Sequence, residues 1–134
     1  MPSAAEKKIR PKYLSLPAIL FQIRLPLPGW VSILHRVSGA WLFFPFAACL
    51  LFALDHSLAS EAGFLSVKSY LQMPLVKLVA LVFIWSYCHH FCAGIRFLLL
   101  DLDKGVELRT ARISSWVVIV AGLVLTGLLG AKLL

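Results

Sequence analysis

Three long apolar stretches, at about residues 30–54, 75–100 and 113–133, constrain this sequence more than any other feature. Each is long enough to cross the ~30 Å hydrocarbon layer of a bilayer as a helix that rises ~1.5 Å per residue. Each is also far longer than a barrel strand of about 10 residues, and hydrocarbon offers no water to satisfy an open backbone. The sequence therefore predicts an all-α membrane protein with three transmembrane helices.

The composition of the chain argues against a water-soluble fold. Of 134 residues, 60% are hydrophobic and only 14% are charged, and the mean hydropathy is +0.89. Soluble domains average roughly 45–50% apolar and 25% charged residues, and one small domain cannot hide so large an apolar surface from water. Hydrocarbon must serve as the solvent for most of this chain.

The net charge is +7, and eight of the 13 lysine and arginine residues lie either before the first apolar span or between the second and third spans. Those before the first span are Lys7, Lys8, Arg10, Lys12 and Arg24, and those between the second and third spans are Lys104, Arg109 and Arg112. Positive segments near a span resist translocation, so segment 1–29 and loop 101–112 are predicted to be cytoplasmic. The connection 55–74 and the C-terminus are then periplasmic. Arg96 lies close enough to the same end to extend toward that boundary. This distribution argues against a nucleic-acid partner.

The ends of the chain and its cysteines add two weaker predictions. Residues 1–24 contain neither an apolar core followed by a cleavage site nor a clear transit-peptide composition, which favours a bacterial inner-membrane protein. Cys49, Cys88 and Cys92 fall inside apolar spans, where cysteine usually serves as a packing residue. A thiolate–metal site at Cys88 and Cys92 is the less favoured interpretation.

Several local features predict the details of the helices. Pro45 should distort the first span near its middle. A short interfacial helix is expected at about 64–71, and Pro74 is a favourable first-turn residue for the second span. In the third span, Gly122, Thr126 and Gly130 form a stripe of small residues that permits close helix contact, although such stripes also occur by chance.

Ionisable side chains within a span are costly unless they face a partner or a cavity. In the first span Ser32, His35, Arg36 and Gly39 lie at positions i, i+3, i+4 and i+7, which places them on one helix face. A hydroxyl, an imidazole, a guanidinium and a bare backbone patch predict a polar pocket. In the alternative, Arg36 extends to lipid phosphate and the others satisfy neighbouring helices.

The second span carries a candidate haem ligand. His90 and Gly94 are spaced i, i+4, so a flat ligand bound to the imidazole could lie along a residue without a side chain. Core hydrogen bonding is the alternative role for such a histidine. The adjacent His89 points ~100° away around the helix. His35 and His90 lie roughly 9 and 15 Å from the same membrane face, so one site built from two helices is possible.

A haem that transfers electrons usually has two axial ligands, and the remaining histidine, His56, lies in the predicted outer connection. Either the haem is held by one ligand, or the second ligand comes from another polypeptide, which is the preferred interpretation.

Two motifs resemble the signatures of the succinate dehydrogenase cytochrome b subunit family. They read Ser32-Ile-Leu-His35-Arg36-Val-Ser38-Gly39 and His90-x-x-x-Gly94-Ile95-Arg96 followed by Asp101. Arg10-Pro11 with Leu14 and Leu16 is similar to the family's N-terminal approach, so the resemblance covers nearly the whole chain. The chain departs from the family at Phe97, where some relatives carry a second histidine, and at Ser15-Leu-Pro-Ala-Ile, which lacks the Ser-Pro-His of many members.

The resemblance implies a function and a set of partners. His90 would be the axial ligand of haem b, Ser32 and Arg36 would bind a quinone, and the haem pocket would include His35, Arg36, Gly39 and Gly94. A second small membrane subunit would complete the helical bundle and supply the other axial histidine. An iron–sulfur subunit and a flavoprotein would dock on the cytoplasmic side.

In this interpretation, electrons from succinate reach ubiquinone in the respiratory chain and the tricarboxylic acid cycle, while this chain performs no succinate chemistry itself. The alternatives are a small transporter whose histidines and Arg36 line an ion path, and a purely structural anchor without haem.

Overall fold

The computed structural model describes residues 25–132, and every regular element within that range is a helix. In chain order the elements are α1 (Leu27–Trp41), the π-helix η2 (Leu42–Phe46), α2 (Ala47–Ala59), α3 (Glu61–Tyr70), α4 (Pro74–Asp101) and α5 (Leu108–Gly130). The segments Leu27–Ala59, Pro74–Asp101 and Leu108–Gly130 are long and apolar enough to cross a membrane. The predicted fold class is therefore confirmed.

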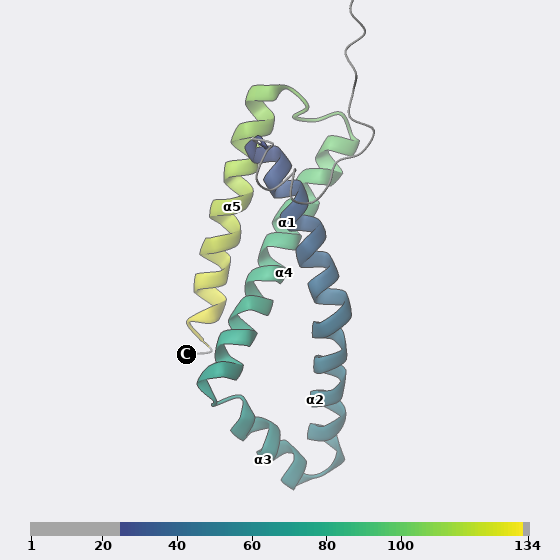
Figure 1. Ribbon diagram of the computed structural model, residues 1–134, viewed down its shortest axis with the longest axis vertical. Helices are drawn as coiled ribbons and strands as arrows, with labels where there is room; N and C mark the ends of the chain where they lie inside the picture. The colour runs from purple at the N-terminus through teal and green to yellow at the C-terminus, as the bar shows by residue number, and fades with distance from the viewer. Residues whose placement is uncertain (1–24, 133–134) are drawn as a thin grey trace, which may run out of the picture.

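The central element of the bundle is α4, which packs against both α1 and α5, and α1 and α5 also contact each other. Figure 1 shows α1, η2 and α2 as one long rod beside α4, with α3 linking the far ends of the two. The three long helices meet around the small buried side chains of Val31, Ala93 and Val118. Small residues at this level allow the helices to approach closely, as is typical of membrane bundles.

The ends of the helices differ in detail from the predicted spans. The first rod begins at Leu27, just after the extended residue Pro26, and it continues to Ala59. His56 therefore lies in the last turn of α2, whereas the sequence placed it in a connection. A turn with positive φ at Asp103 and Gly105 separates α4 from α5. Where the membrane surfaces cut these helices stays a prediction, and the five N-terminal cations lie outside the described residues.

Two of the local predictions take definite form in the structure. The distortion expected at Pro45 is the π-helical turn Leu42–Phe46, because proline lacks the N–H that a regular α-helical turn would use. The expected interfacial helix extends from Glu61 to Tyr70, and its first turn is capped by Ser60, whose Oγ accepts a hydrogen bond of 3.0 Å from the Gly63 N–H.

The stripe of small residues on α5 is confirmed as the contact face with α4. Gly122, Thr126 and Gly130 are all buried. A Cβ placed on Gly122 would lie 3.4 Å from the Cα of His89, and one on Gly130 would lie 2.6 Å from Cδ1 of Leu81. The Thr126 hydroxyl donates to the Gly122 carbonyl at 2.6 Å, so its polar atom is satisfied within the helix.

A larger side chain at Gly122 should separate α5 from α4. We expect Gly122→Leu to destabilise the fold by about 1–3 kcal/mol, because its branches would meet the His89 backbone. Gly127→Leu is the matched control, since a Cβ at Gly127 meets nothing within 4 Å. Thermal unfolding of the purified protein should give a lower midpoint for the Gly122 variant alone. Equal midpoints for the two variants would contradict this packing.

Candidate functional site

The candidate site lies at the contact between α1 and α4 and centres on the imidazole of His90. The Nδ1 atom of His90 is 3.0 Å from the backbone carbonyl oxygen of His35 and 3.4 Å from the hydroxyl of Ser38. Ser38 is buried and donates its own hydroxyl to the same carbonyl at 3.0 Å. A carbonyl oxygen only accepts hydrogen bonds, so the Nδ1 atom of His90 carries the proton. The lone pair of a neutral imidazole is then at Nε2, which forms no hydrogen bond within residues 25–132.

Gly39 allows His90 to approach the backbone of α1. A Cβ on Gly39 would lie 2.7 Å from Cε1 of His90 and 3.2 Å from Nδ1. Any side chain at this position would therefore displace the ring and break its hydrogen bond to the His35 carbonyl. The absence of a side chain at Gly39 therefore lets the His90 ring pack directly against the backbone of α1.

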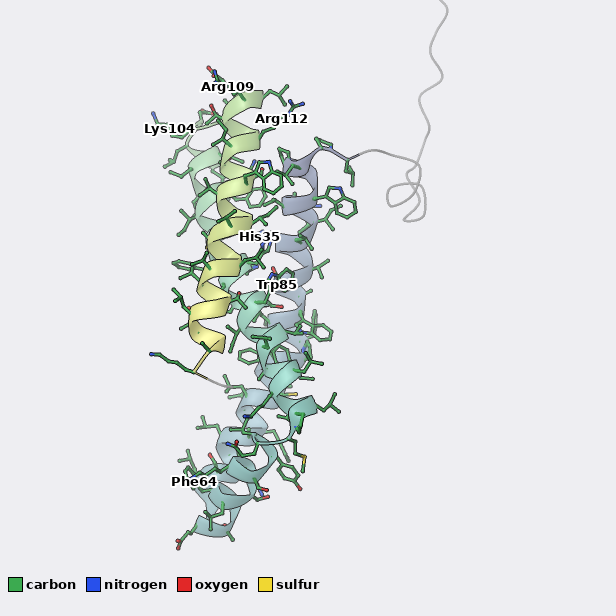
Figure 2. The ribbon with its side chains drawn as sticks, turned by 90° about the vertical axis from the view of Figure 1, so that its left-hand side faces the viewer. His35, Phe64, Trp85, Lys104, Arg109 and Arg112 are labelled. Atoms are coloured by element: carbon green, nitrogen blue, oxygen red, sulfur yellow. The ribbon has the colours of Figure 1, made fainter. Side chains whose placement is uncertain are left out.

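The ring of His35 lies parallel to that of His90, with centroids 4.2 Å apart and an interplanar angle of 10°. On its other side Phe97 packs at a centroid distance of 5.0 Å. A Cβ on Gly94 would lie 3.7 Å from Nε2 of His35, which is ordinary contact distance. The structure thus joins His35, His90, Gly39 and Gly94 in one cluster, so the single site that the sequence allowed across two helices is formed. Figure 2 places His35 between the end of the bundle that carries Arg109 and the level of Trp85.

Ser32 and Arg36 are not drawn into this cluster by hydrogen bonds. Ser32 is half-buried, Arg36 is exposed, and neither forms a hydrogen bond within the described part of the chain. The polar face of α1 is therefore divided. His35 and Gly39 turn toward α4, while the guanidinium and the hydroxyl remain available to a molecule outside this bundle.

His89 belongs to a different environment from His90. It is 2% exposed, its ring stacks on Trp85 at a centroid distance of 5.5 Å, and its backbone faces Gly122 of α5. Its Nε2 atom is buried and has no hydrogen-bond partner among the described residues. The separation of the two histidines around the helix, predicted from their spacing, turns the backbone of His89 toward Gly122 of α5 and the ring of His90 toward Gly39 of α1.

Arg96 was predicted wrongly from the sequence. Its side chain is 6% exposed, so it does not extend freely toward the membrane boundary. The Nε atom instead donates a 3.0 Å hydrogen bond to Oγ of Ser114 on α5. Both residues lie a little more than one turn from the ends of their helices, so the depth comparison used for the two histidines could have paired them as well.

No three potential metal-ligating side chains of the described residues come together to form a metal site. Cys88 is buried, Cys92 is partly buried, and both are free thiols. Among the described residues, no three histidine, cysteine, aspartate or glutamate side chains lie close enough together to hold one metal ion. His90 is the single side chain best arranged to bind a metal. A metal-binding histidine is commonly oriented by a hydrogen bond from the ring nitrogen that does not bind the metal, and Nδ1 of His90 makes such a bond.

Known proteins resemble this chain in sequence. Residues 7–129 match the family described as succinate dehydrogenase/fumarate reductase transmembrane subunit. The chain is 31% identical over 102 residues to the succinate dehydrogenase cytochrome b556 subunit of Rickettsia prowazekii (strain Madrid E), covering 74% of this chain and 76% of the relative. It is 32% identical over 110 residues to the subunit of the same name from Rickettsia felis (strain URRWXCal2), covering 79% and 82%. The family resemblance is thus confirmed, and the chain belongs to the succinate dehydrogenase/fumarate reductase transmembrane subunit family.

Proposed function

We propose that this chain is the membrane subunit of a succinate dehydrogenase that holds haem b through His90 and binds a quinone beside Ser32 and Arg36. The observation that carries the proposal is the fixed imidazole of His90, with Nδ1 hydrogen-bonded to the His35 carbonyl and Nε2 free of hydrogen bonds in the described range. Relatives of the chain carry the name cytochrome b556, which agrees with a b-type haem.

The residues around His90 fit a haem in three respects. The ring is held in one tautomer with its free nitrogen available to iron. Gly94 leaves backbone without a side chain one turn further along α4. His35 and Arg36 on α1 supply polar groups that can meet propionates. When bound there, haem b would supply a one-electron redox centre whose potential depends on its ligands and its burial.

His90 is the histidine of this chain that would hold the haem iron, so a further ligand would come from a partner. His56 lies at the far end of the bundle, in the last turn of α2, and His89 is buried toward α5. A second small membrane subunit is therefore part of the proposal. Exposed aromatic side chains on the α1–α2 rod, such as Trp41, Phe43 and Phe44, offer an apolar surface on which its helices could pack.

Ser32 and Arg36 are proposed to bind the quinone. They are one turn apart on α1, and both keep unused hydrogen-bonding groups in the described structure. A guanidinium and a hydroxyl can each donate a hydrogen bond to a quinone carbonyl oxygen. These bonds become stronger as negative charge develops on that oxygen during reduction. The guanidinium stays protonated, so the protons that complete the quinol come from water or a neighbouring group. Ubiquinone is the proposed quinone on the strength of the family resemblance.

The proposed topology places the N-terminus in the cytoplasm of a bacterium and the C-terminus in the periplasm. Lys104, Arg109 and Arg112 lie together at one end of the bundle, and Phe64 of α3 lies at the opposite end (Figure 2). Positive residues are retained on the cytoplasmic side of membrane proteins, which supports this orientation. The iron–sulfur subunit and the flavoprotein of the complex would then dock at the basic end.

The topology can be tested with reporter fusions in a bacterial host. Alkaline phosphatase fused after the C-terminus should be active, because it folds in the periplasm, and green fluorescent protein at the same point should be dark. Fusions within the loop at Gly105 should give the reverse pattern. Fluorescence from the C-terminal fusion would overturn the orientation.

The haem ligand can be tested by matched substitutions of the two adjacent histidines. We expect the reduced-minus-oxidised spectrum of the purified complex to show a b-type haem that is lost in His90→Phe. In His89→Phe the spectrum should persist, because the His90 imidazole keeps its hydrogen bond to the His35 carbonyl, whereas the His89 ring stacks on Trp85 instead. Loss of the signal only in the His89 variant would move the ligand by one residue. If the wild-type complex shows no haem spectrum, the haem proposal is wrong and the interpretation of the chain as a purely structural anchor remains.

The quinone-binding role of Arg36 predicts a selective loss of activity. In Arg36→Gln we expect the KM for a short-chain ubiquinone to rise by about tenfold or more, as a charge-assisted hydrogen bond is lost. Succinate oxidation with a water-soluble dye as acceptor should remain unchanged, because it bypasses the membrane subunit. Arg112→Gln, an exposed cation in the first turns of α5, is the control. An equal loss of dye reduction in the Arg36 variant would point to assembly rather than quinone binding.

A further inference from the structure

A groove between the end of α4 and the beginning of α5 lies outside the proposed haem and quinone sites. It encloses about 450 Å³, within the range of small-molecule sites and too little to seat a helix about 10 Å across. Apolar side chains from both helices line most of it. Its polar part is made by Arg96, Lys104, Thr110 and Ser114.

Arg96 is the unusual residue of this groove. It is 6% exposed, yet no carboxylate within residues 25–132 pairs with it. Its Nε atom donates to Ser114, and its guanidinium carbon lies 5.3 Å from the centroid of the Phe97 ring. A guanidinium has five N–H donors, and one is used by Ser114. A charge buried without a counter-charge is costly in a membrane protein, so an anion is expected beside it.

The other residues that line the groove indicate what kind of molecule carries that anion. Lys104 adds a second cation at the end of the bundle, and none of the lining residues is acidic. From there the groove runs along Ile95 and Leu99 of α4 and Val117 of α5, which are 46%, 48% and 60% exposed. The occupant therefore needs an anionic group at the basic end and a long apolar chain directed toward the membrane interior.

We propose that this groove binds an anionic phospholipid, with its phosphate at Arg96 and Lys104 and one acyl chain along Ile95, Leu99 and Val117. Basic pockets between transmembrane helices on the cytoplasmic side are suited to anionic headgroups. In the proposed topology this end of the bundle faces the cytoplasmic leaflet. The lipid would complete the contact between α4 and α5 on the side of α4 that the haem site does not use.

The binding can be measured by native mass spectrometry of the complex purified in mild detergent from membranes that contain phosphatidylglycerol. We expect the wild type to retain this lipid, and retention to fall by about tenfold in Arg96→Gln, which loses the phosphate contact. Leu99→Trp and Lys104→Gln test the same groove without removing the bond between Arg96 and Ser114. Arg109→Gln, which does not line the groove, should retain the lipid.

Several outcomes would overturn the proposal. Equal retention in the wild type and in all three groove variants would exclude the site. Loss of the second membrane subunit from Lys104→Gln or Leu99→Trp, with the lipid retained, would make the groove a protein contact. Adding back dioctanoyl phosphatidylglycerol to the delipidated wild type should raise its unfolding temperature, whereas phosphatidylcholine should not. An equal rise with inorganic phosphate would assign the site to a free anion instead.

Discussion

The hydrogen bond from the His90 imidazole to the backbone carbonyl of His35 is the interaction on which the rest of the site depends. It joins α1 to α4, two of the three helices that are long and apolar enough to cross a membrane. It also decides which ring nitrogen carries the proton, and so which nitrogen can act as a ligand. The bond can form only because Gly39 leaves space for the ring. A backbone feature of one helix thereby sets the chemistry of a side chain on another.

The face of α4 toward α1 carries the candidate site, and the face toward α5 packs closely against that helix. His90 and Gly94 face α1 and build the candidate site, whereas His89 and Arg96 are buried toward α5. Because 3.6 residues complete one turn, adjacent histidines fall on these different faces. The α5 side uses glycine at position 122 to bring backbones together, and this close packing holds α4 in place. The rigidity of the packed face supports the orientation of the ligand face.

The sequence predicted the parts of this structure that depend on periodicity and depth. The three helices, the small-residue face of α5 and the proximity of His35 to His90 all follow from spacing along one helix or distance from one membrane face. Arg96 was misplaced because its bond to Ser114 depends on the side-chain conformation between two helices. The role of Ser38, which donates to the same carbonyl that holds His90, was missed for the same reason. Helix ends differed because a helix can continue through polar residues such as His56 after its apolar run has ended.

The exposure of Arg36 explains why this subunit needs a partner. A cation within an apolar span is costly unless it faces a partner or a cavity, and this guanidinium is exposed in the described bundle. Large apolar side chains such as Phe43 and Phe44 are exposed on the same rod. A second subunit that packs there would shield the charge from lipid and enclose the quinone and the free face of His90 in one step. In the proposed complex the site would therefore be shared by two chains, and the polar groups that are costly in the isolated subunit would become binding groups.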